Sequence, residues 1–534
     1  MKQILIPIMT MVLLAYFPGC RQSNSELATL KLQILDQSTR KQIPARVLLK
    51  SADGKSYYPP DAVTLNIATE VWFMIPGYSQ IDVPARKITL RIERGKEYER
   101  IKGELNLSAK QVRDTTIILR RWIDMKQRGY MSGENHLHRS PEDIAALCAA
   151  EDLDYGTVLQ WWKGQRFEVE DSIDNAQNLY FGGISIPTTL YDMENENDWG
   201  ALYVINLKKP FPFHDNPSMP NLFVAQYGRN QGAVICYQAG WSREVLIDAL
   251  LGYVDIVNVC NNNFHMHRYQ PRSFYSNLLD VPDLPVYPDS PVGMMQMNTD
   301  SYYRLLNCGL KIAAGAGSAT GVKEVPVGYN RSYVHCSPQD GIEGFLQAWK
   351  EGKNFVTNGP MLFLRTRNGL QPGDSLLISG EKKTITLNIN AISDSPLQTV
   401  EIVINSQIVK SFPIDGIQKK FDGSVKVEIE SSSWICARCT DRDLLLNDKE
   451  LTLYEGPPVK LNQKPSRLRF AHTSPIYLQM NGNHVVVQKS IKEGRGIIRA
   501  FKEFAEQNAA KEYQKMILEA TRQADCILSS LNAD

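Results

Sequence analysis

The chain has 534 residues, which is too long for a single hydrophobic core, so roughly two to four domains are expected. Its hydrophobic share of 43%, charged share of 22% and formal net charge of +1 are typical of an ordinary globular protein. Because these values provide no strongly basic surface, we expect no nucleic-acid partner.

The first twenty residues form an apolar segment that ends in small residues. Lys2 precedes an apolar run over residues 4–17, and Gly19-Cys20 follows shortly after it. The run is short for a membrane span and is typical of an export signal. Its end is similar to that of a bacterial lipoprotein signal, which predicts lipidation at Cys20; the alternative is an ordinary export signal. We therefore expect an exported protein, periplasmic or attached to the outer membrane of a bacterium through its lipid anchor alone.

Residues 27–121 show the pattern of a β-sandwich. Apolar and polar residues alternate over residues 30–34 and again over residues 88–92. Turn pairs such as Asp53-Gly54 and Pro76-Gly77 separate such stretches. The period of two predicts half-buried strands with one face toward a core.

The segment Gly133-Glu134-Asn135-His136-Leu137-His138 places three potential metal ligands at every second position. On a strand, Glu134, His136 and His138 would point to the same face, because side chains alternate. One strand would then supply two imidazoles and a carboxylate to one ion. The alternative is a solvated strand that carries polar residues, since the spacing constrains geometry and not the number of ligands.

A second His-x-His pair, His265 and His267, follows later in the chain. Asn263 precedes it in the same phase, so a second strand would direct both imidazoles to one face. Both pairs would then converge on one end of the central domain. The run of asparagines at residues 261–263 makes an irregular loop an equally plausible structure.

A helix is predicted directly after the first motif. Ser140 is placed as its N-cap, Pro141 as its first residue, and Asp143 for a capping box. The buried stripe of this helix leads to Glu151, whose carboxylate is costly there unless it is paired or binds a metal. Residues 155–162 are predicted to form the next strand. Short apolar runs alternate with helical stretches over residues 122–358, which indicates an α/β domain.

The remaining residues predict a second β region and a helical end. Alternating apolar residues recur within residues 359–485, which favours a second β-sandwich. After Gly496 the apolar period becomes helical, and two amphipathic helices are expected within residues 486–534.

The centre of the chain resembles the CehA/McbA (carbaryl hydrolase-like) family of metallohydrolases, which is related to the polymerase-and-histidinol-phosphatase (PHP) domains. The resemblance covers most of the chain after residue 20, including the leading sandwich, which is similar to a carboxypeptidase-regulatory-type domain. The segments that carry it are residues 133–139, 150–153, 199–200, 316–318, 327–334, 356–360 and 470–475. It implies a distorted β/α barrel that holds one or more divalent metals at the C-terminal ends of its strands and hydrolyses its substrate with a metal-activated water.

The chain departs from the pattern of this family at several ligand positions. Glu134 stands where the family commonly has aspartate, and the family's Thr-Asp-His motif falls on Leu159-Gln160-Trp161. We therefore expect a rebuilt site with other ligands. The expected metal ligands are His136, His138, Glu194, His265 and His267, and the expected catalytic residues are Glu134, Glu151 and Arg331.

Two of these residues have simpler explanations. Glu194 lies in the acidic run 192–198, which is otherwise typical of a solvated loop. Arg331 is expected to orient an anionic group of the substrate, although it would also fit stacking on Tyr329 or Tyr333.

The leading functional hypothesis is an exported metal-dependent hydrolase. Mixed imidazole and carboxylate ligands suit zinc, manganese or iron better than calcium or magnesium. Glu134 or Glu151 would act as general base. By the resemblance, the substrate is an amide, a carbamate or an ester, with a phosphoester as the second choice.

Two alternatives assign no catalysis to the chain. In one, the barrel is a scaffold whose tryptophans stack on a carbohydrate-like ligand, which makes the chain a cell-surface binding protein. In the other, the β domains are attachment modules. No feature of the sequence indicates an oligomeric state.

Overall fold

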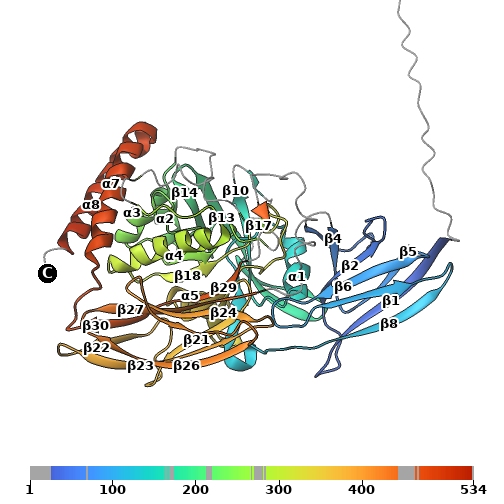
Figure 1. The fold of residues 1–534 in the computed structure, drawn as a ribbon. Helices are drawn as coiled ribbons and strands as arrows, with labels where there is room; N and C mark the ends of the chain where they lie inside the picture. Colours follow the sequence, from blue (N-terminus) through green and yellow to red (C-terminus); the bar gives the residue numbers. More distant parts are fainter. Residues whose placement is uncertain are drawn as a thin grey trace, which may run out of the picture.

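The computed structural model of the chain shows a mixed α/β protein (Figure 1). Its strands lie in six sheets within the residues that the structure describes. These residues are 26–67, 70–162, 165–166, 174–211, 219–265, 268–269, 281, 284–442, 464–465 and 468–531. The predicted export signal and Cys20 lie outside them, so export and lipidation stay predictions.

Two sheets at one end of the molecule form the N-terminal part (Figure 1). The three-stranded sheet has the order β5-β1-β8 and the five-stranded sheet the order β3-β4-β2-β6-β7. Every second residue of β1 is buried, as the alternation predicted, and the buried residues of both sheets form one core. The strands are β1 (Leu27–Asp36), β2 (Ala45–Ser51), β3 (Thr64–Ile67), β4 (Glu70–Ile75), β5 (Tyr78–Pro84), β6 (Lys87–Glu93), β7 (Ile101–Asn106) and β8 (Val112–Leu119).

An eight-stranded mixed sheet forms the centre, with the order β11-β10-β13-β14-β15-β16-β18 and with β12 beside β13. Pairs β10–β13, β15–β16 and β16–β18 are parallel, whereas β13–β14 and β14–β15 are antiparallel. The strands are β10 (Gly156–Trp162), β11 (Gln165–Arg166), β12 (Ala176–Phe181), β13 (Ile184–Asn197), β14 (Gly200–Ile205), β15 (Val234–Tyr237), β16 (Ile256–Cys260) and β18 (Ala313–Ala316).

A nine-stranded sheet joins the centre to the C-terminal part. Its order is β22-β30-β27-β29-β20-β19-β9, with β24 on β27 and β25 on β24. Strands from both sides of the domain boundary predicted at residue 359 therefore share one sheet. The strands are β9 (Tyr130–Gly133), β19 (Arg331–His335), β20 (Asn354–Thr357), β22 (Ser375–Ile378), β24 (Leu397–Ile404), β25 (Gln407–Phe412), β27 (Ser433–Asp441), β29 (Arg469–Thr473) and β30 (Ile476–Met480).

The described residues also form two small sheets. A three-stranded sheet with the order β21-β23-β26 shares one core with the nine-stranded sheet. A short pair, β17–β28, connects residues that are far apart in the chain. These strands are β17 (Arg268–Tyr269), β21 (Met361–Thr366), β23 (Lys383–Ile392), β26 (Lys420–Ile429) and β28 (Lys464–Pro465).

The expected distorted β/α barrel is not confirmed, because the hydrogen bonds of the described residues form no closed barrel. β9 pairs with β19 in the nine-stranded sheet and meets the central sheet through one isolated bridge between Gly133 and Tyr155. β18 lies beside β20 at the other seam. The central sheet and the nine-stranded sheet are thus two separate sheets that adjoin at these two places.

Helices cover the central sheet and one end of the molecule (Figure 1). The helix predicted after Ser140 begins at Pro141 with Ser140 as N-cap, but no side-chain capping bond forms and Asp143 pairs with Arg139 instead. The two C-terminal helices share the core of the central part. No helix in the described part of the chain has the length and apolar character needed to cross a membrane. The helices are α1 (Pro141–Ala150), α2 (Asn221–Arg229), α3 (Val245–Leu250), α4 (Pro291–Asn307), α5 (Gly341–Lys350), α7 (Gln488–Asn508) and α8 (Lys511–Ser530).

Candidate metal centre

The first His-x-His motif lies in an extended loop that follows β9. The backbone N–H of His138 donates to the carbonyl of Thr320 at 2.8 Å, and the N–H of Ala319 donates to the carbonyl of His136 at 2.8 Å. This segment therefore runs alongside the chain that leaves β18. Because its backbone is held on one side, the directions of the two imidazoles are set by the fold and not by local sequence.

Two glycines make room for this loop. A Cβ at Gly317 would lie 2.5 Å from the Cβ of His136, and a Cβ at Gly321 would lie 2.0 Å from the carbonyl oxygen of His138. Gly321 also has a φ of +107°, which disfavours any other residue. The small residues of this loop therefore allow it to approach the motif closely.

Three side chains converge at the motif: His136, His138 and Glu194. The two Nε2 atoms lie 2.9 Å apart. The Oε2 atom of Glu194 lies 3.0 Å from Nε2 of His138 and 3.4 Å from Nε2 of His136. Two ligand atoms at about 2.05 Å from a tetrahedral zinc ion are about 3.3 Å apart, so the observed separations suit one shared ion.

The burial and charge of these side chains also fit a cation. His136 is 3% exposed and Glu194 is 1% exposed. Burial lowers the pKa of His136, which favours the neutral imidazole that a metal ion requires. Burial by itself would raise the pKa of Glu194, but the two imidazoles outweigh it and hold that pKa well below its usual range. Oε2 of Glu194 has no aligned hydrogen-bond donor among the described residues, and a bound cation would satisfy it.

Strand pairing brings the third candidate ligand to the motif. β13 and β14 pair so that Glu194 lies opposite Tyr203. The hydroxyl oxygen of Tyr203 lies 2.7 Å from Nδ1 of His136. If Nδ1 carries the proton and donates to this oxygen, Nε2 faces Glu194 as an acceptor, which is the usual arrangement for a metal-binding histidine. One register therefore positions both Glu194 and the hydroxyl group that contacts His136.

An aromatic side chain covers His138. The rings of His138 and Trp162 lie 4.8 Å apart at 54°. Nε1 of Trp162 donates to Oε2 of Glu196 at 2.7 Å, which fixes the indole from the far side. The described part of the site is thus bounded by an indole that excludes water from one imidazole.

Glu134 does not share the face of the two histidines, which corrects the sequence prediction. Its carboxylate accepts the backbone N–H of Ser318 at 2.7 Å and that of Gly328 at 2.9 Å. The strand β9 ends at Gly133, so the alternation of side chains no longer applies to the residues after it. Glu134 fastens two loops behind the motif and is not a ligand of the cluster.

Glu151 also lies outside the cluster. Its Oε1 accepts from Nε of Arg46 at 2.5 Å, and Nη2 of Arg46 lies 2.7 Å from Oε2 of Glu93. The requirement that this buried carboxylate be paired is met, but by an arginine of the N-terminal sheets, 105 residues earlier in the chain. With its charge engaged in this way, Glu151 is not placed as general base for the metal cluster.

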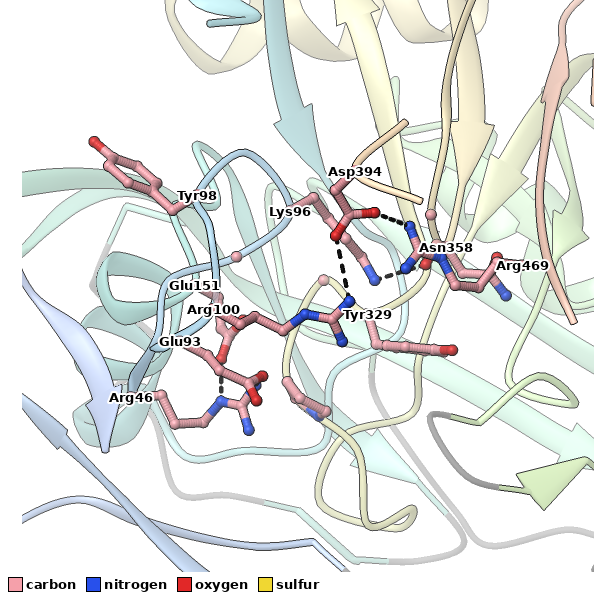
Figure 2. A pocket seen from close by; sticks show the side chains of 14 residues that line it. Arg46, Glu93, Lys96, Tyr98, Arg100, Glu151, Tyr329, Asn358, Asp394 and Arg469 are labelled. Atoms are coloured by element: carbon pink, nitrogen blue, oxygen red, sulfur yellow. Dashed lines mark hydrogen bonds and ion pairs between the residues drawn. The ribbon is translucent and has the colours of Figure 1, made fainter. Parts of the chain in front are cut away.

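Figure 2 shows the pocket in which this ion pair lies, where the N-terminal sheets, the centre and the C-terminal strands meet. Asp394 lies 3.3 Å from Arg100 and 2.5 Å from Arg469. Lys96 donates to the carbonyl of Asn358 at 2.7 Å. The pocket encloses only about 50 Å³, so its charged side chains mainly join the three parts of the chain.

Arg331 is buried and structural, contrary to the expectation that it would meet the substrate. It is 0% exposed, and its guanidinium donates to the carbonyl of Gly328 at 2.6 Å and to that of Glu151 at 3.0 Å. A third donation, at 3.3 Å, reaches the carbonyl of Asp152. The guanidinium nitrogens of Arg331 thus donate to three backbone carbonyls, and the side chain connects β19 to the end of α1.

The second His-x-His pair does not complete the cluster in the described part of the chain. His265 is buried, but no ligand atom of it belongs to the group formed by His136, His138 and Glu194. The residues after β16 turn at positions 261–263 instead of extending the strand. His267 lies outside the described residues.

Sequence reasoning missed Tyr203 and did not place Trp162 against a ligand. Tyr203 lies in β14, where every residue is buried, so it reads as part of an apolar core strand. Only its position opposite Glu194 on the neighbouring strand indicates that Tyr203 belongs to the site. That position depends on the strand register, which the sequence does not show. Glu194 itself lies on a strand and not in a solvated loop.

Fold and site together define a mixed α/β protein with a buried His-His-Glu cluster able to hold a metal ion. No family model matches the chain, and no curated protein sequence matches it significantly.

Proposed function

We propose that the protein is a metal-dependent hydrolase similar to the CehA/McbA family, with His136, His138 and Glu194 as metal ligands. The observation that carries this proposal is the convergence of two Nε2 atoms and a buried carboxylate oxygen within 3.4 Å of one another. Such a set brings two imidazole nitrogens and a carboxylate oxygen together in a buried site, where a shared proton or a bound cation is needed to compensate their lone pairs. Nitrogen and oxygen donors favour zinc, manganese or iron.

A bound divalent ion would supply Lewis-acid chemistry and lower the pKa of a water ligand. The chain's own residues hold the site in shape for this. Tyr203 fixes the orientation of His136, and Trp162 shields His138 from solvent. Three protein ligands leave room for water or substrate, as catalytic sites require. We propose an amide, carbamate or ester substrate, with a phosphoester as the second choice.

The general base predicted from the sequence is not carried into this proposal. Both carboxylate oxygens of Glu134 accept backbone N–H groups, and Glu151 is paired with Arg46. Proton transfer is therefore assigned to neither residue.

The surrounding fold is proposed to be a partly open relative of the PHP-like barrel. Its support is that the central and nine-stranded sheets meet at both seams, through Gly133 and Tyr155 on one side and through β18 and β20 on the other. Export and lipid anchoring through Cys20 belong to the same proposal and depend on the leader sequence.

The test is elemental analysis of the purified chain, followed by assays with chromogenic esters, carbamates, amides and phosphoesters. About one zinc, manganese or iron per chain, together with turnover that a chelator abolishes and metal restores, is the expected result. Metal without turnover of any of these substrates would favour the non-catalytic binding protein. Absence of metal after growth with added metal would overturn the proposed centre.

A further inference from the structure

A large groove lies on the face of the sheet β21-β23-β26 that points away from the shared core. The strands of this sheet run along the lower part of Figure 1. Its volume is about 920 Å³, which is in the range of pockets that hold small organic ligands. Arg128 and Tyr130 form one wall at the start of β9, and the three strands form the floor. This groove is separate from the metal cluster, none of whose residues line it.

Strand register places the polar side chains of the floor in two rows. Phe363, Asn390 and Asp422 are direct neighbours across the three strands. Arg365, Asn388 and Ser424 form the next row, two residues along each strand. Because side chains alternate, both rows face outward, while the residues between them pack into the core.

The groove carries an excess of positive charge. Arg128, Arg365 and Lys420 have no carboxylate within ion-pair distance among the described residues, although other cations of this sheet do: Lys382 lies 2.6 Å from Glu428. Among the described residues, Asp422 is the one acidic residue that lines the groove, and its Oδ1 atom accepts from Nδ2 of Asn390 at 2.5 Å. Three cations and one carboxylate give the lining a net charge of +2, against +1 for the whole chain.

An aromatic ring forms part of the same surface. Phe363 is partly exposed. Its ring centre lies 5.7 Å from that of Tyr130 and 5.2 Å from the guanidinium carbon of Arg128. Partly exposed aromatic faces stack on sugar rings, amides exchange hydrogen bonds with hydroxyl groups, and guanidinium groups bind carboxylates or sulfates. Asn388 supplies an exposed amide beside Arg365.

We propose that this groove binds an acidic oligosaccharide, meaning a sugar chain that carries carboxylate or sulfate groups. Charge complementarity accounts for the negative groups, and the combination of a ring with amides in one groove accounts for the sugar. An acidic polypeptide would satisfy the charges alone and would make no use of Phe363 as a stacking platform. The site would bring the protein to a negatively charged glycan independently of any chemistry at the metal centre.

The test is binding of the full chain to polygalacturonate, dextran sulfate, neutral dextran and polyglutamate, measured by calorimetry at about 150 mM salt, where exposed charges are well screened. Binding to polygalacturonate or dextran sulfate, and not to dextran, is expected. The first two polymers distinguish carboxylate from sulfate recognition. Phe363→Ala and Arg365→Ala should each weaken binding by about tenfold or more, as central aromatic and arginine contacts commonly do.

Lys383→Ala is the matched control, because it removes an exposed lysine from β23 outside the groove. It should leave binding unchanged. Equal binding of polyglutamate, or loss of affinity in Lys383→Ala as large as in Phe363→Ala, would show a nonspecific charge effect and overturn the proposal. Failure of both acidic polysaccharides to bind would overturn it as well.

Discussion

Glu194→Gln is the most direct test of the metal centre. The substitution keeps the size of the side chain and removes the negative charge from one of the three candidate metal ligands. Loss of groups that only orient a ligand costs about 10- to 100-fold in metal affinity, so loss of a direct ligand should cost about 100-fold or more. At about 1.4 kcal/mol for each factor of ten, this is about 2.8 kcal/mol of binding free energy.

The same loss has a measurable effect on thermal stability. Metal at 100 times its dissociation constant stabilises the native protein by about 2.7 kcal/mol, whereas metal at a concentration equal to the dissociation constant contributes only about 0.4 kcal/mol. With about 2–4 °C per kcal/mol for a folding unit of 150–250 residues, metal should raise the Tm of the native protein by about 5–11 °C. The rise in Glu194→Gln should be about 1–2 °C.

Metal content by mass spectrometry and melting curves with chelator or added zinc are the assays. Glu104→Gln is the matched control, because it makes the same substitution at an exposed glutamate outside the cluster. Circular dichroism should show the native fold in every variant. If Glu194→Gln retains full metal content and the full Tm shift, then Glu194 is not a ligand and the geometric argument is refuted.

Three further predictions concern the surroundings of the site and the core. Tyr203→Phe should weaken metal binding by about 10- to 100-fold in chelator competition while the fold is kept, because His136 loses the group that orients it; unchanged affinity would contradict this role. Gly317→Ala should destabilise the protein by about 1–3 kcal/mol in urea unfolding, because the new Cβ would overlap His136, whereas Gly103→Ala meets no atom within 4 Å and should have little effect. Burial raises the pKa of Asp248 from 3.8 to about 8, so the folded chain keeps a proton that the unfolded chain has lost between these pH values. Stability should therefore fall as pH rises through this window, by at most about 1.4 kcal/mol per pH unit for this proton, and Asp248→Asn should flatten the slope; an unchanged slope would refute it.

Local patterns in the sequence determined the elements and part of the site. The alternation in β1 predicted its buried face, and the Ser140-Pro141 pair predicted where α1 begins. The His136-x-His138 spacing predicted that two imidazoles meet, and they do. The alternation and the helix start are encoded within a few residues, because backbone period and capping are local properties. The two imidazoles meet outside any strand, in a loop that the chain after β18 holds by backbone hydrogen bonds.

Tertiary structure alone decided which carboxylates serve the site. Glu194 lies beside the histidines because β13 and β14 pair in the register that places it opposite Tyr203. The sequence of neither strand alone determines this register. Glu134 does not lie on the face of the two histidines, because β9 ends one residue before it. Its carboxylate instead accepts the backbone N–H of Ser318, in the loop after β18.

The roles of Glu151 and of the domain boundary also depend on distant parts of the chain. Glu151 is paired because the N-terminal sheets place Arg46 beside the end of α1. The boundary predicted at residue 359 lies within one continuous sheet because β20 pairs with β29, more than a hundred residues later by number. Contacts between residues so far apart depend on the packing of the whole chain. The local alternation of apolar and polar residues, from which sequence predictions are made, does not determine them.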